Sequence, residues 1–292
     1  MASTACKDVG PTPPLGNTVM ARLYLVIKKH GVTSIRDFYD KCGEAEWMYF
    51  ATKLQEKMIS KVNSMISIVN YGVVKFQKDR PMAVLGKYVF ERKNMMDLQD
   101  ASLVLDEHFR KNSIDPASFV EDLFKVLRQD EYKMNTFRIT GAPDTGKSLI
   151  LRAVVEPFIA NIQGVSGCAS EFYFADMVNK SVILLEELWV TDATADDFKS
   201  LLSGYPFQVA VKHSNHRETI LRTPVLVTSN HAEFGKGYLN PTDEEALGRR
   251  CYTYRFDVKF EPYLPGYEGD PAYHVDVKPW QIIAWMNNIH YH

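Results

Sequence analysis

Cysteine is scarce in this 292-residue chain, and Cys6, Cys42, Cys168 and Cys251 lie far apart, with no C-x-x-C pair. This spacing excludes a disulfide framework and a zinc site built on paired cysteines, and it predicts free thiols in a reducing compartment. No apolar run approaches the roughly 18 residues that a membrane span requires. Residues 1–14 are polar and proline-rich, unlike a signal peptide. The sequence therefore predicts a soluble, intracellular protein without a membrane partner.

An excess of charge of either sign is also absent, because 34 Lys and Arg face 36 Asp and Glu and give a formal net charge of −2. Bulk attraction to nucleic acid is excluded, so any contact with DNA must come from a local basic segment. Hydrophobic residues make up 46% of the chain and aromatic residues 12%, and we find no internal repeat or low-complexity tract. These values predict a well-packed protein of one large or two modest domains.

Apolar residues at helical spacing dominate residues 1–112. A first helix is expected over 17–29, and Thr33 is expected to cap a second helix that runs to Cys42. The strongest stripe, from Trp47 to Val69, predicts one helix of about six turns. We interpret 1–112 as an N-terminal helical domain, with oligomerisation as its expected role and no sign of chemistry.

The pattern changes near Ser113, where residues 113–292 are expected to form the second domain. Asp115 followed by Pro116 is typical of a helix start, since Asp caps the first turn and proline suits the first helical position. From Thr136 onward, short β-favouring runs alternate with helical segments. This rhythm predicts an α/β domain with a central parallel sheet and crossover helices.

The most informative segment matches G-x-x-x-x-G-K-[ST] without a mismatch: Gly141-Ala142-Pro143-Asp144-Thr145-Gly146-Lys147-Ser148. A β-favouring run precedes it and a helical run, 149–158, follows it, which is the context that a P-loop requires. Lys147, expected to be partly exposed, would contact the β- and γ-phosphates, and the Ser148 hydroxyl would bind Mg²⁺. A Gly-Lys turn without a ligand is the simpler alternative, and the flanking elements disfavour it. The motif predicts that the chain binds a nucleoside triphosphate.

Two further strands end in polar residues. The apolar run 181–185 leads into Glu186 and Glu187, a Walker B pattern in which one carboxylate holds the Mg²⁺ shell and the next orients or deprotonates the attacking water. The run 224–229 ends in Asn230, where a γ-phosphate sensor would lie. The simpler alternative for 181–187 is a core strand that enters an acidic loop, and the alternative for Asn230 is an ordinary turn residue. Their order after the P-loop favours the catalytic interpretation.

This series, GAPDTGKS at 141–148, VILLEE at 182–187 and PVLVTSN at 224–230, resembles superfamily 3 helicases, the hexameric replication motors of small DNA viruses. The approach to the P-loop, 115–136, looks like that of the parvovirus nonstructural replication protein, of densovirus type. Val211-Lys212-His213 is similar to the β-hairpin tip of papillomavirus replicative helicases. The resemblance covers about residues 113–260.

The resemblance implies a modified AAA+ fold, a homohexameric ring, ATP and Mg²⁺ as cofactors, and movement along single-stranded DNA during viral genome replication in the host nucleus. Lys147 and Ser148 would hold phosphate and Mg²⁺, Glu186 and Glu187 would form the acidic pair, and Asn230 would be the sensor.

Three further positions follow from the same resemblance. Lys212 and His213 would touch the DNA backbone in the ring channel. Arg250, which aligns better than Arg249, would be the arginine finger. Ala210 departs from parvovirus relatives, which carry an acid near this position, so the DNA contact rests on weaker grounds than the nucleotide site.

Two other functions fit parts of the pattern. A P-loop kinase would need an acceptor-binding lid, which the amide-ended strand and the basic hairpin do not supply. A nucleotide-switched DNA-binding assembly or packaging ATPase without unwinding activity stays open. Parvovirus replication proteins also carry a nicking domain with a His-x-His metal pair. We interpret the one such pattern here, His290-Tyr291-His292, as a terminal polar tail.

Overall fold

The computed structural model describes residues 18–92, 95–164, 172–210 and 217–291. Its contacts divide the chain into two compact units, Met1–Val73 and Val74–His292, and each is described here by itself. The division lies well before residue 112, so helices expected in the N-terminal domain belong to the second unit. The proposed division into functional domains stays a prediction.

The first unit is helical, as expected, and packs around one apolar core. Its elements are α1 (Val19–His30), α2 (Ile35–Lys41), α3 (Glu44–Leu54), the 3₁₀ turn η1 (Gln55–Lys57) and the first part of α4 (Met58–Asp79). Leu23 and Ile27 of α1, Phe38 of α2 and Phe50 of α3 are fully buried in this core. The helical stripes of the sequence therefore face one shared interior.

Two details of this unit differ from the sequence-based expectation. Ser34, not Thr33, caps α2 by accepting a hydrogen bond from the Asp37 N–H at 3.1 Å, while the Thr33 hydroxyl binds the Asp37 carboxylate. The single long helix expected from Trp47 to Val69 is broken at Gln55, whose φ of 49° is left-handed. The apolar stripe continues across the break because both helices face the same core.

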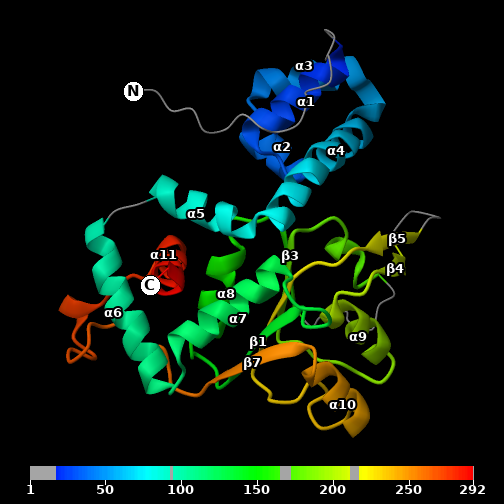
Figure 1. Ribbon diagram of the computed structural model, residues 1–292. Helices are drawn as coiled ribbons and strands as arrows, with labels where there is room; N and C mark the ends of the chain where they lie inside the picture. The colour runs from blue at the N-terminus through cyan, green and yellow to red at the C-terminus, as the bar shows by residue number, and fades with distance from the viewer. Residues whose placement is uncertain (1–17, 93–94, 165–171, 211–216, 292) are drawn as a thin grey trace. The chain divides into compact units, whose positions relative to one another are not determined.

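The second unit is an α/β domain, and Figure 1 shows its sheet between layers of helices. Its helices are α5 (Pro81–Arg92), α6 (Met95–Lys111), α7 (Pro116–Arg128), α8 (Lys147–Val155), α9 (Ala195–Ser203), α10 (Pro241–Gly248) and α11 (Pro279–Tyr291), with 3₁₀ turns η2 (Ala175–Met177) and η3 (Pro271–Tyr273). Its strands are β1 (Thr136–Gly141), β2 (Ala160–Gly164), β3 (Val182–Glu186), β4 (Phe207–Ala210), β5 (Arg217–Ile220), β6 (Val225–Ser229) and β7 (Cys251–Phe256).

Five of these strands form one parallel sheet in the order β2-β3-β6-β1-β7. The P-loop strand β1 lies between β6 and β7, and β3 lies on the other side of β6. Parallel strands present all their carboxyl ends at one edge, so the segments that follow β1, β3 and β6 meet there. The expected fold, a P-loop NTPase of modified AAA+ type with a central parallel sheet, is confirmed.

Alternate residues of the strands enter two separate cores, one on each face of the sheet. Val182 and Leu184 of β3 pack in the core formed with α5, α6, α7, α8 and α11. Ile183 and Leu185 pack in the core beneath α9, α10 and the β4–β5 hairpin. Burial on both faces explains the apolar runs Val182–Leu185 in β3 and Val225–Val227 in β6.

The last turn of α4 and the helices α5 and α6 are built into this second unit. Gln77 of α4 donates to the Pro157 carbonyl at 3.2 Å, and its side-chain oxygen accepts from the Ile159 N–H at 2.9 Å and the Ser181 hydroxyl at 2.7 Å. These bonds tie α4 to the loop before β2 and to the start of β3. The helical segment that precedes the P-loop domain therefore supports its sheet directly.

Other expectations have mixed outcomes. Asp115 caps α7, and its carboxylate accepts from the Ser118 N–H at 2.9 Å, as predicted. His290 does not lie in a polar tail, because it sits in the last turn of α11 with its ring 5.0 Å from that of Phe124. Within the described ranges, Cys42 and Cys251 are free and buried, and no helix is long and apolar enough to cross a membrane.

Candidate active site

The two glycines of the P-loop are required by its backbone. Gly141 ends β1 with a φ of 133°, and a Cβ there would lie 1.8 Å from the Phe256 carbonyl oxygen of the neighbouring strand. Gly146 has a φ of 81° and is the residue from which α8 begins. Any side chain at these positions would collide or be strained. The loop therefore closes between β1 and the positive end of α8, where anions bind favourably.

Lys147 is 5% exposed, so the expectation of a partly exposed lysine was wrong. Its ammonium group donates to the Gly141 carbonyl at 3.1 Å, to the Thr145 hydroxyl at 3.2 Å and to the Ala142 carbonyl. Burial lowers the Lys147 pKa, while the nearby Glu187 and Asp144 carboxylates oppose that shift. The loop thus holds the Lys147 ammonium group against its own backbone, where a bound polyphosphate would lie close to it.

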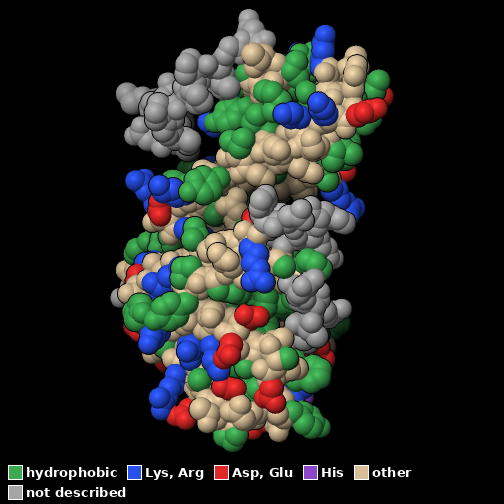
Figure 2. Space-filling view, turned by 90° about the vertical axis from the view of Figure 1, so that its right-hand side faces the viewer, with side chains coloured by type: hydrophobic (Ala, Val, Ile, Leu, Met, Phe, Trp, Pro, Cys, Tyr) green, Lys and Arg blue, Asp and Glu red, His purple; other side chains and the backbone are tan. Residues whose placement is uncertain are grey.

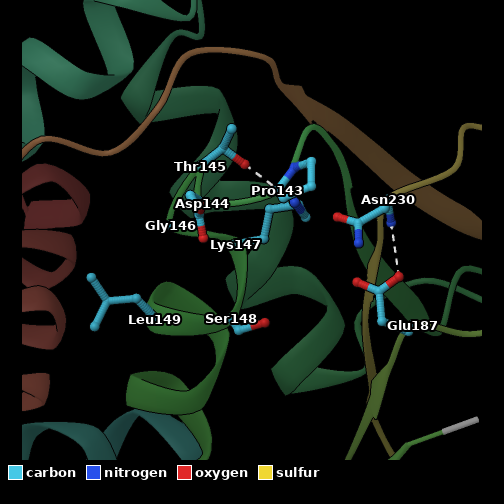
Figure 3. Close-up of a pocket in the computed structure, with 9 residues that line it drawn as sticks. All are labelled: Pro143, Asp144, Thr145, Gly146, Lys147, Ser148, Leu149, Glu187 and Asn230. Atoms are coloured by element: carbon cyan, nitrogen blue, oxygen red, sulfur yellow. Dashed lines mark hydrogen bonds between the residues drawn. The ribbon is translucent and has the colours of Figure 1, made fainter.

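The P-loop, the end of β3 and the end of β6 enclose one cavity of about 270 Å³. It is lined by Pro143, Asp144, Thr145, Gly146, Lys147, Ser148, Leu149, Glu187 and Asn230. Figure 3 shows the Glu187 carboxylate beside Asn230, whose backbone N–H donates to it at 3.2 Å. The tertiary structure therefore brings together three segments that are distributed over residues 143–230 of the sequence.

Glu186 and Glu187 have different surroundings although they are neighbours in the chain. Glu187 takes a left-handed φ of 55° and lines the cavity. Glu186 is paired with Arg152 of α8, which donates to both carboxylate oxygens at 2.7 and 2.5 Å. The Glu186 side chain is 19% exposed and that of Arg152 is 58% exposed. A metal ion at Glu186 would therefore compete with an arginine fork.

Arg250 follows α10 and lies away from this cavity. Its guanidinium donates to the Lys199 carbonyl at 3.1 Å and to the Ala246 carbonyl, so both contacts lie within its own unit. Arg249 is more exposed, with 77% of its side chain accessible and a salt bridge to Glu245. The structure thus separates the candidate finger from the nucleotide cavity of the same chain.

The expected hairpin is present as β4 and β5, which pair antiparallel from Phe207 with Ile220 to Ala210 with Arg217. Lys212 and His213, the residues predicted to touch DNA, lie outside the described residues. Figure 2 shows the face that carries α9 and α10, where acidic and basic side chains lie beside one another in the lower part. A DNA contact on this face would need a local basic group.

Two contacts of the P-loop were not predicted from the sequence. His108 of α6 is 4% exposed, and its Nε2 lies 3.0 Å from the Thr145 carbonyl oxygen. Next to His108, the Phe260 N–H donates to the Asp144 carbonyl at 2.8 Å. No local motif marks these residues, since His108 lies on an ordinary amphipathic helix more than 30 positions upstream.

A glycine-rich loop, a buried lysine, an acid and an amide at the carboxyl edge of a parallel sheet define the class of P-loop NTPases. The profile described as "Parvovirus non-structural protein NS1" matches residues 29–233, which is more than half of the chain. The chain therefore belongs to the parvovirus non-structural protein NS1 family, which confirms the resemblance to superfamily 3 viral replication proteins.

Individual relatives agree with this assignment. The initiator protein NS1 of feline panleukopenia virus is 30% identical over 170 residues, which cover 55% of this chain and 40% of that protein. The initiator protein NS1 of Bombyx mori densovirus is 26% identical over 144 residues, covering 48% and 16%. The replication protein E1 of bovine papillomavirus type 5 is 24% identical over 178 residues, covering 60% and 27%. The chain thus matches less than half the length of each of these relatives.

Among solved structures, a JCV helicase is similar to this chain with a TM-score of 0.57. The match covers 92% of this chain and 80% of that one, at 14% sequence identity. At this identity the likeness shows a shared fold. It extends over the helical N-terminal part as well as the P-loop domain.

Proposed function

We propose that this chain is an ATP-dependent DNA helicase domain that moves along single-stranded DNA during viral genome replication. The observation that carries the proposal is the convergence of the P-loop, Glu187 and Asn230 on one cavity at the carboxyl edge of the sheet. Membership of the NS1 family supports a replication role. We further propose a homohexameric ring that acts in the host nucleus, as the superfamily resemblance implies.

ATP and Mg²⁺ are the proposed cofactors, and the residues present fit them. Gly141 to Ser148 would hold the phosphates, because the loop offers backbone N–H groups, the start of α8 and the buried Lys147 ammonium. The Ser148 hydroxyl and Glu186 would hold the metal, with Glu186 leaving its pair with Arg152. When bound, Mg²⁺ neutralises charge on the transferring phosphoryl group.

The remaining residues are assigned to the hydrolysis step and to contact with DNA. Glu187 would orient the attacking water and accept its proton, since its carboxylate lines the cavity. Asn230 would sense the terminal phosphate from the end of β6. Arg250 of an adjacent subunit would stabilise developing charge, and Lys212 with His213 would contact the DNA backbone.

The test is a Mg²⁺-dependent ATPase assay with and without single-stranded DNA, followed by strand displacement on a forked duplex. We expect turnover that DNA stimulates, together with unwinding. A kinase would not respond to DNA, and a nucleotide-switched scaffold would turn over little in either condition. ATPase activity with DNA binding but no strand displacement would favour the packaging or assembly alternative over the helicase.

A further inference from the structure

Two consecutive carbonyl groups of the P-loop are held by donors from outside the loop. The Phe260 N–H donates to the Asp144 oxygen at 2.8 Å, and His108 Nε2 lies 3.0 Å from the Thr145 oxygen. Because a carbonyl oxygen only accepts, the hydrogen of this second bond must reside on His108 Nε2. His108 is therefore present as the tautomer that donates from Nε2.

Holding a carbonyl also orients the next amide. In a planar trans peptide the C=O of one residue and the N–H of the next point in opposite directions. All peptide bonds of the described ranges are trans. The bonds from the Phe260 backbone N–H and the His108 imidazole therefore turn the Thr145 and Gly146 N–H groups away from these two donors. Thr145 and Gly146 line the cavity, and adjacent N–H groups that point one way make an anion-binding concavity.

The imidazole that makes this bond is itself held in place. It stacks on the Phe256 ring at 5.3 Å between centroids and 16° between planes, and it meets the Phe260 ring edge-on at 5.0 Å. Asn112, the residue directly after α6, donates to the His108 carbonyl at 2.9 Å and accepts from the Asp257 and Val258 N–H groups at 2.8 and 2.9 Å. The end of α6 and the segment after β7 thus form one support behind the P-loop.

Protonation does not disturb this arrangement near neutral pH. Burial, together with the nearby Lys111 ammonium, lowers the pKa of His108 to about 4, and only the bond to Thr145 opposes the shift. A neutral imidazole behind the P-loop adds no charge to the nucleotide site. Its contribution to that site is the hydrogen bond from Nε2 that orients the Thr145 carbonyl group.

We propose that His108 is a positioning residue for the nucleotide site, which presets the Gly146 N–H to receive a phosphate oxygen by holding the Thr145 carbonyl. This inference rests on the proposed nucleotide function and deepens it. It makes phosphate affinity depend on α6, a helix that precedes the segment of motif resemblance. The alternative is that His108 merely fills space in the core.

Two substitutions of similar polarity separate these roles. In His108→Gln the side-chain amide nitrogen lies as many bonds from the backbone as Nε2, so it retains the donor to Thr145. In His108→Asn the amide is one bond shorter and cannot reach. The full 292-residue chain would be used, with His274→Asn as the control, because His274 is exposed and lies outside the cavity.

Dissociation constants for ATP and ADP would be measured with a fluorescent analogue and competition, together with the Tm of each variant. We expect His108→Asn to bind about fivefold to tenfold more weakly, the loss typical of one hydrogen bond. His108→Gln should stay within about twofold of the wild type on the same scale, and the control should be unchanged. Wild-type affinity in His108→Asn, or equal losses in both variants, would overturn the proposal.

A second measurement needs no substitution and covers the case in which His108→Asn does not fold. Hydrogen exchange at the Gly146 amide of the wild-type chain should slow when ATP is bound, and unchanged exchange would overturn the positioning role. If the wild-type chain binds no nucleotide, the proposed function itself is wrong and this inference with it. Nucleotide binding without the difference between Asn and Gln overturns the inference alone.

Discussion

The carboxyl edge of the sheet and the junction of α9 with α10 hold their charged side chains in opposite ways. At the edge, the P-loop, Glu187 and Asn230 surround an open cavity. At the junction, Arg250 is bound to two carbonyl oxygens of its own unit, and Lys199 of α9 pairs with Asp243 of α10 at 2.6 Å. The charged groups at the sheet edge line an open cavity, whereas those at the junction of α9 with α10 are bonded to neighbouring groups of the same unit.

The difference indicates how the proposed catalytic groups are assembled. The phosphate-binding groups meet within one chain, since the P-loop, Glu187 and Asn230 line one cavity and His108 and Phe260 of the same unit bond the loop backbone. A role for Arg250 at a neighbour's site requires it to exchange neutral carbonyl partners for a charged phosphate. The guanidinium is charged in both arrangements, but an anionic phosphate oxygen attracts it more strongly than a neutral carbonyl oxygen does, which favours that exchange.

The largest expected effect concerns Arg250, at the junction of α9 with α10. Arg250→Ala should lower ATPase turnover by about a thousandfold, the range for an arginine finger, while nucleotide still binds. Mixing Arg250→Ala with Lys147→Ala chains should restore part of the activity, because some interfaces then combine an intact P-loop with an intact Arg250. Turnover across mixing ratios would be measured in rings whose mixed composition is verified.

Arg249→Ala is the matched control for this experiment, since Arg249 is adjacent, exposed and paired with Glu245. Loss of turnover in Arg249→Ala with normal activity in Arg250→Ala would reverse the assignment. Absence of recovery in verified mixed rings would argue against a shared site.

Lys147→Ala removes the ammonium group from the cavity at the carboxyl edge of the sheet. Turnover should fall about a hundredfold to a thousandfold, as when one strong electrostatic contact to the transition state is lost. Stability should also fall by about 1–3 kcal/mol, because buried loop acceptors lose their donor. ATPase rates and urea unfolding would be compared with Lys75→Ala, an exposed control. Normal turnover in folded Lys147→Ala protein would disprove the nucleotide assignment.

The two adjacent acids provide the next comparison. Glu187→Gln should bind Mg·ATP but lose about a hundredfold in turnover, since an amide cannot accept the proton. Glu186→Gln should weaken Mg²⁺ dependence and change stability by less than about 1 kcal/mol, because its partner Arg152 is mostly exposed. Mg²⁺ titrations of ATPase activity would separate the two. Normal hydrolysis in both variants would make the end of β3 purely structural.

The support behind the P-loop predicts a pH effect. His108 has its pKa lowered to about 4 in the folded protein, so the unfolded chain takes up a proton first as the pH falls. The free energy of unfolding should therefore decrease between about pH 6.5 and pH 4, by roughly 3 kcal/mol in total. Urea unfolding at several pH values would measure it. His108→Gln should flatten this part of the profile, and an unchanged profile would contradict the buried neutral state.

The smallest effect concerns the hairpin, whose tip residues lie outside the described ranges. Lys212→Ala should weaken single-stranded DNA binding about threefold to tenfold for all base sequences alike and reduce its salt dependence. Basal ATPase activity should persist, while unwinding fails. Fluorescence anisotropy over a salt series would report this, with Lys75→Ala again as the control. Unchanged affinity and unwinding in a Lys212→Ala, His213→Ala double variant would remove the hairpin from the mechanism.

Local pattern was sufficient for much of the fold. The strands around Phe137, Leu184 and Val227 were predictable because they are short β-favouring runs followed by glycine or polar residues. The cap at Asp115 was predictable because its geometry is local. The break at Gln55 was not, since the apolar stripe has the same period on both sides of it and the interruption depends on how two helices share one core.

The sequence by itself determined which groups can bind a phosphate. The P-loop letters, the acids after β3 and the amide after β6 specify that chemistry through local spacing, and the parallel sheet brings them to one edge. Only the tertiary structure decided which acid faces the cavity and which one Arg152 holds. It also buried Lys147, bonded Arg250 to the carbonyl groups of Lys199 and Ala246, and placed His108 behind Thr145. These choices depend on contacts between residues far apart in the chain, whose partners no local spacing encodes.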